Sequence, residues 1–492
     1  MIFRINFSYL GKLWLFAIVL FVAKLIILPY VHQIDADAVS RVYLSLQFAE
    51  NPHLIQSGNW PPVFFYIMGS ALKLCNNQFY TPVFVNIVFS VLLLFPLFFI
   101  LNRLFEQKIS FLLCVFFSFS PIVFRMSMLA MSEISFLFFL LLSIAVLLKG
   151  LSENKNNMVL LAGIIMSIAS GIRYESWFIS FLIFVLIAYY KTPKKAFLFA
   201  VFAAVIPIYW LLSNYFYADN ALNSFGWAIN LPETNSINSL DSLLRRIWWY
   251  PLSLMFAFGP IAFYFFVKEL RYYKSTIEKR IIAVVFILFF IIWLFNSLRG
   301  SLLLQHRFGL ILFVISFPFL GFYLQRYSNK MILKTAIFSI TAFLLAFVYS
   351  SQSARPIPRL LTKDASEVSQ IINKNINADS GFICDFWNWE TTYYLPFATG
   401  INQKNIEIIE SSDDAISIKS QINTFVVNNK SGVILIAYNK AMYSLISQNM
   451  NQMFVNTSDF SLTLTELYRN NEVACYKYKV SDKNIDSSLR SE

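Results

Sequence analysis

The feature of this sequence that most constrains its fold is a series of long, uninterrupted apolar segments. Only helices and closed barrels satisfy every backbone polar group in lipid, and barrel strands would alternate apolar and polar residues in shorter segments. The chain is 58% hydrophobic and 13% charged, whereas a soluble domain carries about 25% charge. The sequence therefore predicts a mainly α-helical, polytopic membrane protein. Its expected spans, about eleven, are residues 13–30, 81–101, 109–124, 133–148, 158–171, 176–190, 196–217, 250–267, 281–296, 308–324 and 331–349.

A shorter apolar stretch, residues 62–74, follows Trp60-Pro61-Pro62 and is too short to cross a bilayer. We expect it to form a helix that lies at the membrane interface, since the two prolines stiffen the entry to it. Together with a second expected helix at residues 38–49, it would make residues 31–80 a large first loop.

Basic residues alternate between the loops. One set of loops holds mainly lysine, and an excess of Lys and Arg marks cytoplasmic loops. We therefore expect these loops and the N-terminus to face the cytoplasm. We expect the protein to lie in the inner or plasma membrane of the cell. An odd number of spans would then place everything after residue 349 outside. The lysines of this set are Lys108, Lys149, Lys155, Lys191, Lys194, Lys195, Lys268, Lys274, Lys279 and Lys330.

The opposite loops hold arginines, with Lys73 as their one lysine. Arginine offers a planar, multi-donor fork that suits phosphate, whereas lysine is a point charge. We expect the set to bind a lipid-linked phosphate at the outer membrane surface. The alternative is that each arginine snorkels to lipid headgroups. The arginines are Arg41, Arg125, Arg173, Arg245, Arg246, Arg299 and Arg307.

Carboxylates accompany these arginines in three outer loops. Asp35 and Asp37 follow the first span, Glu133 follows Arg125, and Glu175 comes two residues after Arg173. Charge next to hydrocarbon is costly and usually functional, so the convergence on one membrane face predicts a shared polar site. The structural alternatives are separate ion pairs in each loop, and an Asp37 that caps a surface helix and pairs with Arg41.

The chain changes character after Arg355-Pro356-Ile357-Pro358-Arg359. The alternation beyond this point predicts a soluble, three-layer α/β domain over residues 351–492, after a membrane domain of residues 1–350. We expect strands at 381–386, 405–409, 432–438 and 473–480, and helices at 362–376, 415–425 and 440–448.

Residues 351–492 contain 13 basic and 15 acidic residues, so the other 26 basic and 12 acidic residues give the membrane part a net charge of +14. The excess belongs to membrane loops, which argues against nucleic-acid binding. Cys384 and Cys475 lie on expected strands of the outer domain, where a disulfide would be allowed. The histidines and cysteines lack zinc-site spacing, and Asp35-Ala36-Asp37 permits a divalent cation but no cofactor is expected.

Five short motifs resemble, in their order and common side, the GT-C glycosyltransferases. They are most similar to bacterial and archaeal enzymes related to the protein O-mannosyltransferases, and the resemblance covers about residues 1–350. The chain departs from those transferases in lacking a sugar-binding trefoil insert and in having Asp-Ala-Asp in place of adjacent Asp-Glu. The motifs are Asp35-Ala36-Asp37, Asn59-Trp60-Pro61-Pro62, Met131-Ser132-Glu133, Arg173-Tyr174-Glu175 and Gln305-His306-Arg307-Phe308.

The resemblance implies an inverting hexosyl- or pentosyltransferase that moves a sugar from a polyprenyl-phosphate donor to a glycan, lipid or protein acceptor on the outer face. A carboxylate must accept the proton of the acceptor hydroxyl, and cations must hold the leaving phosphate. We assign Asp37 as the base, with Asp35 second. We assign the phosphate to Arg307 and Arg173, with Arg125 and Arg299 as further candidates, and acceptor binding or orientation to Glu133, Glu175, Trp60 and His306.

Two other functions fit parts of the pattern. A transporter or flippase of lipid-linked glycans would place charges at mid-span and show paired, interrupted helices or repeats. Lys24 is the one clear charge inside an expected span, and no repeat is evident. A structural protein of the envelope would work through its C-terminal domain, which leaves the charges clustered on the membrane part without a role.

The expected topology is directly testable. A reporter fused after Glu492 should behave as extracytoplasmic, and one inserted within residues 191–195 as cytoplasmic, because the lysine bias and the odd span count predict both. An alkaline phosphatase and green fluorescent protein pair would read the two positions. A cytoplasmic C-terminus would contradict the outward placement of Asp37 and the arginines.

Overall fold

The structure is a computed structural model of the whole chain. It describes residues 7–30, 36–78, 80–190, 192–223, 240–300, 302, 304–326, 331–351, 363–377, 380–385, 387, 392, 395, 401, 405–409, 415–438, 441–449, 452–456 and 460–482. The chain divides into two compact units. The first comprises Met1–Val31 and His53–Ala354, and the second comprises His32–Pro52 and Arg355–Glu492.

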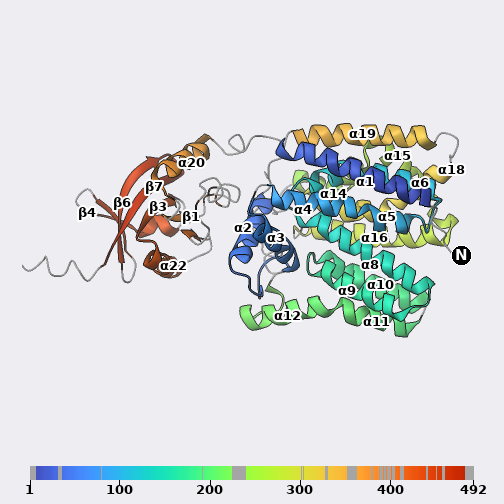
Figure 1. Cartoon of the computed structure of the whole chain (residues 1–492), viewed down its shortest axis with the longest axis horizontal. Helices are drawn as coiled ribbons and strands as arrows, with labels where there is room; N and C mark the ends of the chain where they lie inside the picture. The colour runs from blue at the N-terminus through green and yellow to red at the C-terminus, as the bar shows by residue number, and fades with distance from the viewer. Residues whose placement is uncertain are drawn as a thin grey trace, which may run out of the picture. The chain divides into compact units, whose positions relative to one another are not determined.

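In the described part of the first unit, every element of regular secondary structure is a helix (Figure 1). Each apolar segment expected to span the membrane falls on a helix or on a pair of consecutive helices. The helices are α1 (Phe7–Ile27), α3 (Val63–Leu74), α4 (Thr81–Leu92), α5 (Leu94–Leu101), α6 (Gln107–Ser118), α7 (Pro121–Ser127), α8 (Ser132–Ser152), α9 (Asn156–Ser170), α10 (Glu175–Tyr190), α11 (Pro193–Ala203), α12 (Val205–Ala218), α14 (Leu240–Phe258), α15 (Pro260–Leu270), α16 (Ile277–Leu298), α17 (Leu310–Ser316), α18 (Pro318–Arg326) and α19 (Met331–Ser351), with short 3-10 turns η1 (Leu28–Tyr30), η2 (Tyr273–Ser275) and η3 (His306–Gly309).

Within the described ranges, four helical segments are long and apolar enough to cross a membrane, and the number rises to eight if each bent pair of helices counts as one span. The shorter apolar helices at Asn156–Ser170, Glu175–Tyr190 and Leu333–Leu345 coincide with three further expected spans. The protein is thus a multi-pass, mostly helical membrane protein, while the number eleven stays a prediction.

The expected span at residues 250–267 falls on two helices, α14 and α15. Helices α14 and α15 meet at an angle of 112°. Gly259 between them has a φ of +75°, which L side chains rarely adopt, and Pro260 starts α15.

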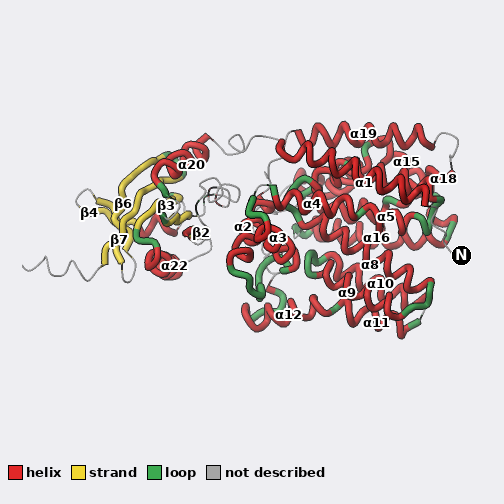
Figure 2. Tube along the Cα trace, viewed as in Figure 1, coloured by secondary structure: helices red, strands yellow, loops and turns green. Residues whose placement is uncertain are grey.

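The second unit contains every strand that the structure describes (Figure 2). Its seven-stranded sheet has the order β2-β1-β3-β7-β6-β5-β4, with β1 parallel to β2 and β3 and the other pairs antiparallel. The expected helix at 440–448 is wrong, because a 3-10 turn η7 (Ala441–Leu445) leads into a strand there. The strands are β1 (Gly381–Asp385), β2 (Ile406–Ile409), β3 (Ser431–Ala437), β4 (Ile446–Asn449), β5 (Gln452–Asn456), β6 (Phe460–Arg469) and β7 (Val473–Asp482).

Side chains of β3 alternate between two hydrophobic cores, as the period of a strand requires. Ile434 and Ile436 pack with α22 (Ala415–Asn428), whereas Val433 and Leu435 pack with α20 (Lys363–Asn375). One helix therefore covers each face of the sheet, which gives three layers, as the sequence predicted.

Cys384 and Cys475 are both free and buried. Cys384 on β1 and Cys475 on β7 are each registered with Leu435, so strand β3 separates them. Two strand spacings amount to about 9.5 Å, beyond the Cα separation that a disulfide bridges. Burial raises the pKa of both thiols, that of Cys475 to about 12. The two cysteines are packing residues of the sheet.

The helix expected at 38–49 is present as α2 (Ala36–Glu50), which begins two residues earlier than the sequence indicated. Asp37 therefore lies in its first turn, where a carboxylate is stabilised by the helix dipole. Arg41, one turn later, is 5% exposed. Asp35, the other carboxylate of the motif, lies outside the described residues.

Candidate functional site

Arg173 is the centre of a buried cluster of charges in the first unit. Its Nη1 lies 2.6 Å from Glu133 Oε1, and its Nε and Nη2 donate to Glu175 Oε1 at 3.0 and 2.6 Å. Nη1 also donates to Ser132 Oγ at 3.3 Å. The side chains of Arg173 and Glu133 are 10% and 3% exposed. Two of the three loops that the sequence predicted to converge do so here.

Local structure explains how these three side chains meet. Glu133 is in the first turn of α8 and Glu175 in the first turn of α10, so both carboxylates sit where the helix dipole favours them. Arg173 lies in the turn between α9 and α10. The turn before α8 is held by Asn86 on α4, which donates to the carbonyls of Leu129 and Met131.

Arg307 approaches the same carboxylate from a third segment. Its Nε lies 3.9 Å from Glu133 Oε1, and its Nη1 lies 3.6 Å from Met131 Sδ. The Phe308 ring contacts both guanidinium groups, that of Arg173 at 5.8 Å and that of Arg307 at 5.3 Å. Trp293 on α16 fixes this turn through a 2.8 Å hydrogen bond from Nε1 to the Phe308 carbonyl. Glu133 thus bridges the two arginines to which the sequence assigned a phosphate.

His306 belongs to an adjoining polar group. Its Nδ1 is 2.9 Å from Ser253 Oγ, and its ring stacks on Trp249 at 4.6 Å and on Phe256 at 5.5 Å. The charge of Arg125 on α7 also acts on His306. All three contacts come from α14, which therefore sets the orientation of the imidazole next to Arg307.

Sequence reasoning included Arg246 in the set of outward arginines expected to bind a phosphate, but gave it no individual role in the site. It is 2% exposed and donates from Nη1 to the Ser297 carbonyl at 2.8 Å. Arg246, Tyr250, Ser253 and Ala257 all face inward on α14, at spacings of four, three and four residues. That helical period was readable in the sequence and would have placed Arg246 on the buried face.

The backbone of residues 55–59, just before Trp60, accepts hydrogen bonds from α12 and from Tyr174, which follows Arg173. Tyr174 donates from its hydroxyl to the Asn59 carbonyl at 3.3 Å and accepts from Trp210 Nε1 at 3.0 Å. Ser213 and Tyr209 on α12 donate to the carbonyls of Gln56 and Ile55. Trp60 itself lies 6.3 Å from the Phe65 ring. These contacts hold the Trp-Pro-Pro motif close to Tyr174, the neighbour of Arg173.

A glycine makes this approach feasible. The backbone N–H of Val63, the first residue of α3, donates to the Gly171 carbonyl at 2.9 Å. A Cβ on Gly171 would lie 2.3 Å from Val63 Cγ2. Only glycine lets the start of α3 pack against the turn that carries Arg173.

The structure does not bring every candidate residue into this cluster. Arg299 follows α16, is exposed, and contacts the ring of Phe295 on its own helix at 5.6 Å. Asp37 belongs to the second compact unit and Asp35 lies outside the described residues. In the described part of the chain, no group of three or more His, Cys, Asp or Glu side chains is placed to hold a metal ion.

The electrostatics of Arg173 follow from its surroundings. Burial alone would lower the pKa of the guanidinium, but the charges of Glu175 and Glu133 outweigh burial and raise it. Arg173 therefore stays charged, and the two carboxylates hold its fork in one orientation. Three arginines, Arg125, Arg173 and Arg307, lie in or beside a region with two carboxylates, so the described polar region is suited to an anion.

Replacing Glu133 with glutamine should destabilise the protein. The change removes one of the two carboxylates that hold buried Arg173, and we expect a loss of about 1–3 kcal/mol in unfolding free energy. The matched control is Asp241→Asn, which breaks the exposed pair of Asp241 with Arg245 and should cost under about 0.5 kcal/mol. Thermal unfolding in detergent measures both. Equal midpoints for the two variants would contradict a structural role for Glu133.

Comparisons with known proteins agree with this architecture. Residues 59–212 match the model of the family described as dolichyl-phosphate-mannose-protein mannosyltransferase. The structure is similar to ArnT from Cupriavidus metallidurans bound to undecaprenyl phosphate, with a TM-score of 0.66, 10% identity, and coverage of 96% of this chain and 98% of ArnT. The apo state of the same ArnT gives 0.63, 12%, 94% and 97%.

The oligosaccharyltransferase of Archaeoglobus fulgidus, in complex with zinc and sulfate, is similar at a TM-score of 0.50 and 11% identity, over 82% of this chain and 64% of that protein. No curated protein matches the sequence. The family match covers the segment from Trp-Pro-Pro through Arg173 to α12, which is the segment that builds most of the polar cluster. The chain therefore has the fold of ArnT, and the mannosyltransferase family model matches the segment that contributes Glu133 and Arg173 to this cluster.

Proposed function

We propose that the protein is an inverting glycosyltransferase that moves a sugar from a polyprenyl-phosphate donor to an acceptor on the extracytoplasmic side of the inner or plasma membrane. The observation that carries the proposal is the linked set Arg173–Glu133–Arg307, buried at one end of a GT-C fold. Buried arginines fixed by carboxylates are suited to a phosphate whose charge grows as it leaves. The donor class is further supported by the undecaprenyl phosphate bound to the similar ArnT.

The two arginines would have different roles. Three nitrogens of Arg173 already donate to Glu133, Glu175 and Ser132, so it has little capacity to bind a second anion. Arg307 is buried beside the same carboxylate, with its Nε 3.9 Å from Glu133 Oε1, and its planar fork suits a phosphate. We assign the donor phosphate to Arg307 and make Arg173 a positioning residue that acts through Glu133. His306 and Arg125 would line the same anion site.

The chemistry is a single displacement. The acceptor hydroxyl attacks the anomeric carbon, its proton passes to the carboxylate of Asp37, and the bond from that carbon to the phosphate oxygen breaks. The lipid phosphate leaves with the negative charge, which Arg307 stabilises. One new C–O bond replaces one old bond at the opposite face of the sugar, so the configuration inverts. No metal enters these steps.

The test is sugar transfer by the purified full chain in detergent. Membrane extracts labelled in their polyprenyl-phosphate sugars serve as donors, and loss of label from the lipid fraction together with its appearance in a new product supports the proposal. Retention of activity in EDTA is expected. Protein that consumes no polyprenyl-linked sugar, but moves lipid-linked glycans across vesicles, would establish the transporter alternative instead.

A further inference from the structure

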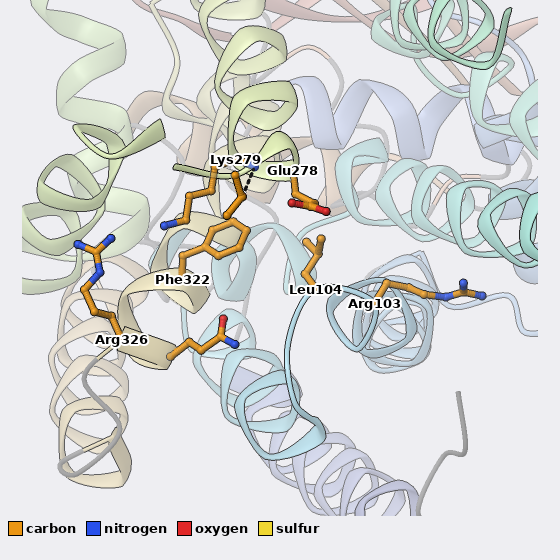
Figure 3. A pocket seen from close by; sticks show the side chains of 8 residues that line it. Arg103, Leu104, Glu278, Lys279, Phe322 and Arg326 are labelled. Carbon is orange, nitrogen blue, oxygen red and sulfur yellow. Dashed lines mark hydrogen bonds between the residues drawn. The ribbon is translucent and has the colours of Figure 1, made fainter. Parts of the chain in front are cut away.

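The two ends of α16 carry polar groups that are satisfied to different degrees. Near its first turn, an open cavity of about 420 Å³ has Lys279 and Arg326 in its lining (Figure 3). Both cations pair with buried Glu269, at 2.5 and 3.2 Å, so they have a partner without any ligand. The last turn is different. There Ser297 accepts from Arg246, and polar atoms on the neighbouring segments lack such partners.

Two buried polar atoms beside Arg307 make no hydrogen bond in the described part of the chain. They are the indole Nε1 of Trp249 and the side-chain carbonyl oxygen of Gln305. A buried group without a partner is costly, and in a native structure it indicates a functional role or an unseen ligand or water. Gln305 directly precedes His306, and Trp249 stacks on the His306 ring at 4.6 Å. The two atoms therefore belong to one small region.

A stack of rings keeps Trp249 from turning toward another partner. Trp249 and Phe256 are seven residues apart on α14, which is about two helical turns, or about 10.5 Å. This spacing leaves room for one ring, and His306 stacks on both, at 4.6 and 5.5 Å. Ser253, which lies between them on the helix, is 2.9 Å from His306 Nδ1. Packing, and not a hydrogen-bond acceptor, therefore fixes the direction of the indole N–H.

The two atoms match hydroxyl groups better than a phosphate. An indole N–H only donates, and an amide carbonyl oxygen only accepts. A fully ionised phosphate has no proton to give to the Gln305 carbonyl, whereas a hydroxyl both donates and accepts. A sugar carries several hydroxyls on one ring, so a single sugar satisfies both atoms. The side chains of Trp249 and Gln305 are half-buried, so each remains partly accessible to a ligand.

The position of Arg307 indicates which sugar this is. The backbone N–H of Phe308 donates to the Gln305 carbonyl at 3.2 Å, which closes the turn that carries Arg307. If the donor phosphate is bound at Arg307, the sugar joined to it through one oxygen lies next to the same turn. In an inverting displacement the acceptor approaches the opposite face of that sugar, farther from the phosphate. The sugar nearest Gln305 is therefore that of the donor.

We propose that Trp249 and Gln305 bind hydroxyl groups of the donor sugar and thereby determine which sugar the protein accepts. Trp249 Nε1 donates to one hydroxyl, and Gln305 Oε1 accepts from another. A sugar with a different configuration at either position leaves a buried polar group unsatisfied, which is how such sites reject close analogues. This inference rests on the proposed function, because it takes the phosphate of the donor to lie at Arg307.

The experiment measures the binding of three lipids to the purified full chain in detergent, namely undecaprenyl phosphate and its glucose- and mannose-bearing forms. We expect the wild type to bind one sugar-bearing lipid more tightly than the other, and more tightly than undecaprenyl phosphate. Trp249→Phe keeps a ring to stack on His306 but lacks the N–H. It should weaken binding of the preferred lipid about 3–10-fold, the effect of one neutral hydrogen bond, and leave binding of undecaprenyl phosphate unchanged.

A second variant tests the acceptor side of the site. Gln305→Met removes the amide while keeping most of the side-chain volume, and it should reduce the preference between the glucose- and mannose-bearing lipids. The matched controls are Trp248→Phe and Gln325→Met, which change exposed residues of the same two types and should leave all affinities unchanged. Thermal unfolding in detergent checks that every variant is folded.

Three results would overturn the proposal. Equal affinity of the wild type for all three lipids would exclude a sugar site. Unchanged binding by Trp249→Phe, or an equal loss with Trp248→Phe, would remove Trp249 from the site. A loss with Trp249→Phe that is the same with and without the sugar would assign the N–H to an ordered water or to the packing of His306.

These readouts separate the sugar site from the proposed function. Sugar transfer with affinities that do not depend on Trp249 would contradict this inference alone. Sugar-specific binding that depends on Trp249, without transfer from any labelled donor, would support the sugar site and contradict the transferase.

Discussion

Replacing Arg307 with alanine should lower the rate of sugar transfer by about 10²–10³-fold, while the protein stays folded. The guanidinium is expected to bind the phosphate more strongly as its charge develops, and loss of one such donor costs this much in other enzymes. Arg173 holds two carboxylates at 2.6 Å, whereas Arg307 lies 3.9 Å from Glu133, so we expect the Arg307 variant to disturb the fold less than removal of Arg173. The rate is measured with a fixed polyprenyl-phosphate donor in detergent.

Two further variants make the result specific. Arg307→Lys keeps the charge but loses the planar fork, so it should recover only part of the rate. Arg299→Ala removes an exposed arginine that contacts Phe295 on its own helix and should transfer at nearly the wild-type rate. If Arg307→Ala and Arg173→Ala both transferred at wild-type rates, the phosphate would be bound elsewhere among the outward arginines.

Replacing Asp37 with asparagine should lower turnover by about 10²–10⁴-fold, the usual contribution of a general base. Asparagine has the size of aspartate and preserves the start of α2, but it cannot accept the acceptor's proton. Asp37 lies in the first turn of α2, and asparagine is well tolerated at the start of a helix. We therefore expect this change to cost little helix stability. Single-turnover assays with excess enzyme would report the chemical step itself.

Asp35→Asn is the matched control, since it removes a carboxylate two residues away. It should reduce turnover less, as expected for a residue that only tunes its neighbour. The capping alternative predicts the reverse pattern at position 37, with asparagine nearly silent and alanine destabilising. Stable, fully active asparagine variants at both positions would exclude this loop from the chemistry and leave Glu133 and Glu175 as candidates for the base.

Some of the site could be predicted because its signals are local. Arg173 and Glu175 are two residues apart, and Glu133 follows directly on Met131-Ser132, so charge in short loops between apolar segments was enough to find them. Arg246 was not given an individual role, although its spacing with Tyr250, Ser253 and Ala257 marked that face of α14 as buried. The segment 440–448 was assigned to a helix, whereas residues 446–449 form β4, which pairs with the next strand β5 in a hairpin.

The sequence by itself determined that the chain is a helical membrane protein with a C-terminal α/β unit, because hydropathy and strand or helix period are properties of consecutive residues. It also determined that arginines and carboxylates occur together in the loops that alternate with the lysine-rich loops. Only the tertiary structure decided which partners they have. Glu133 bridges Arg173 and Arg307, and strand β3 separates Cys384 from Cys475. Such pairings depend on how distant segments pack, and packing is set by the whole chain at once.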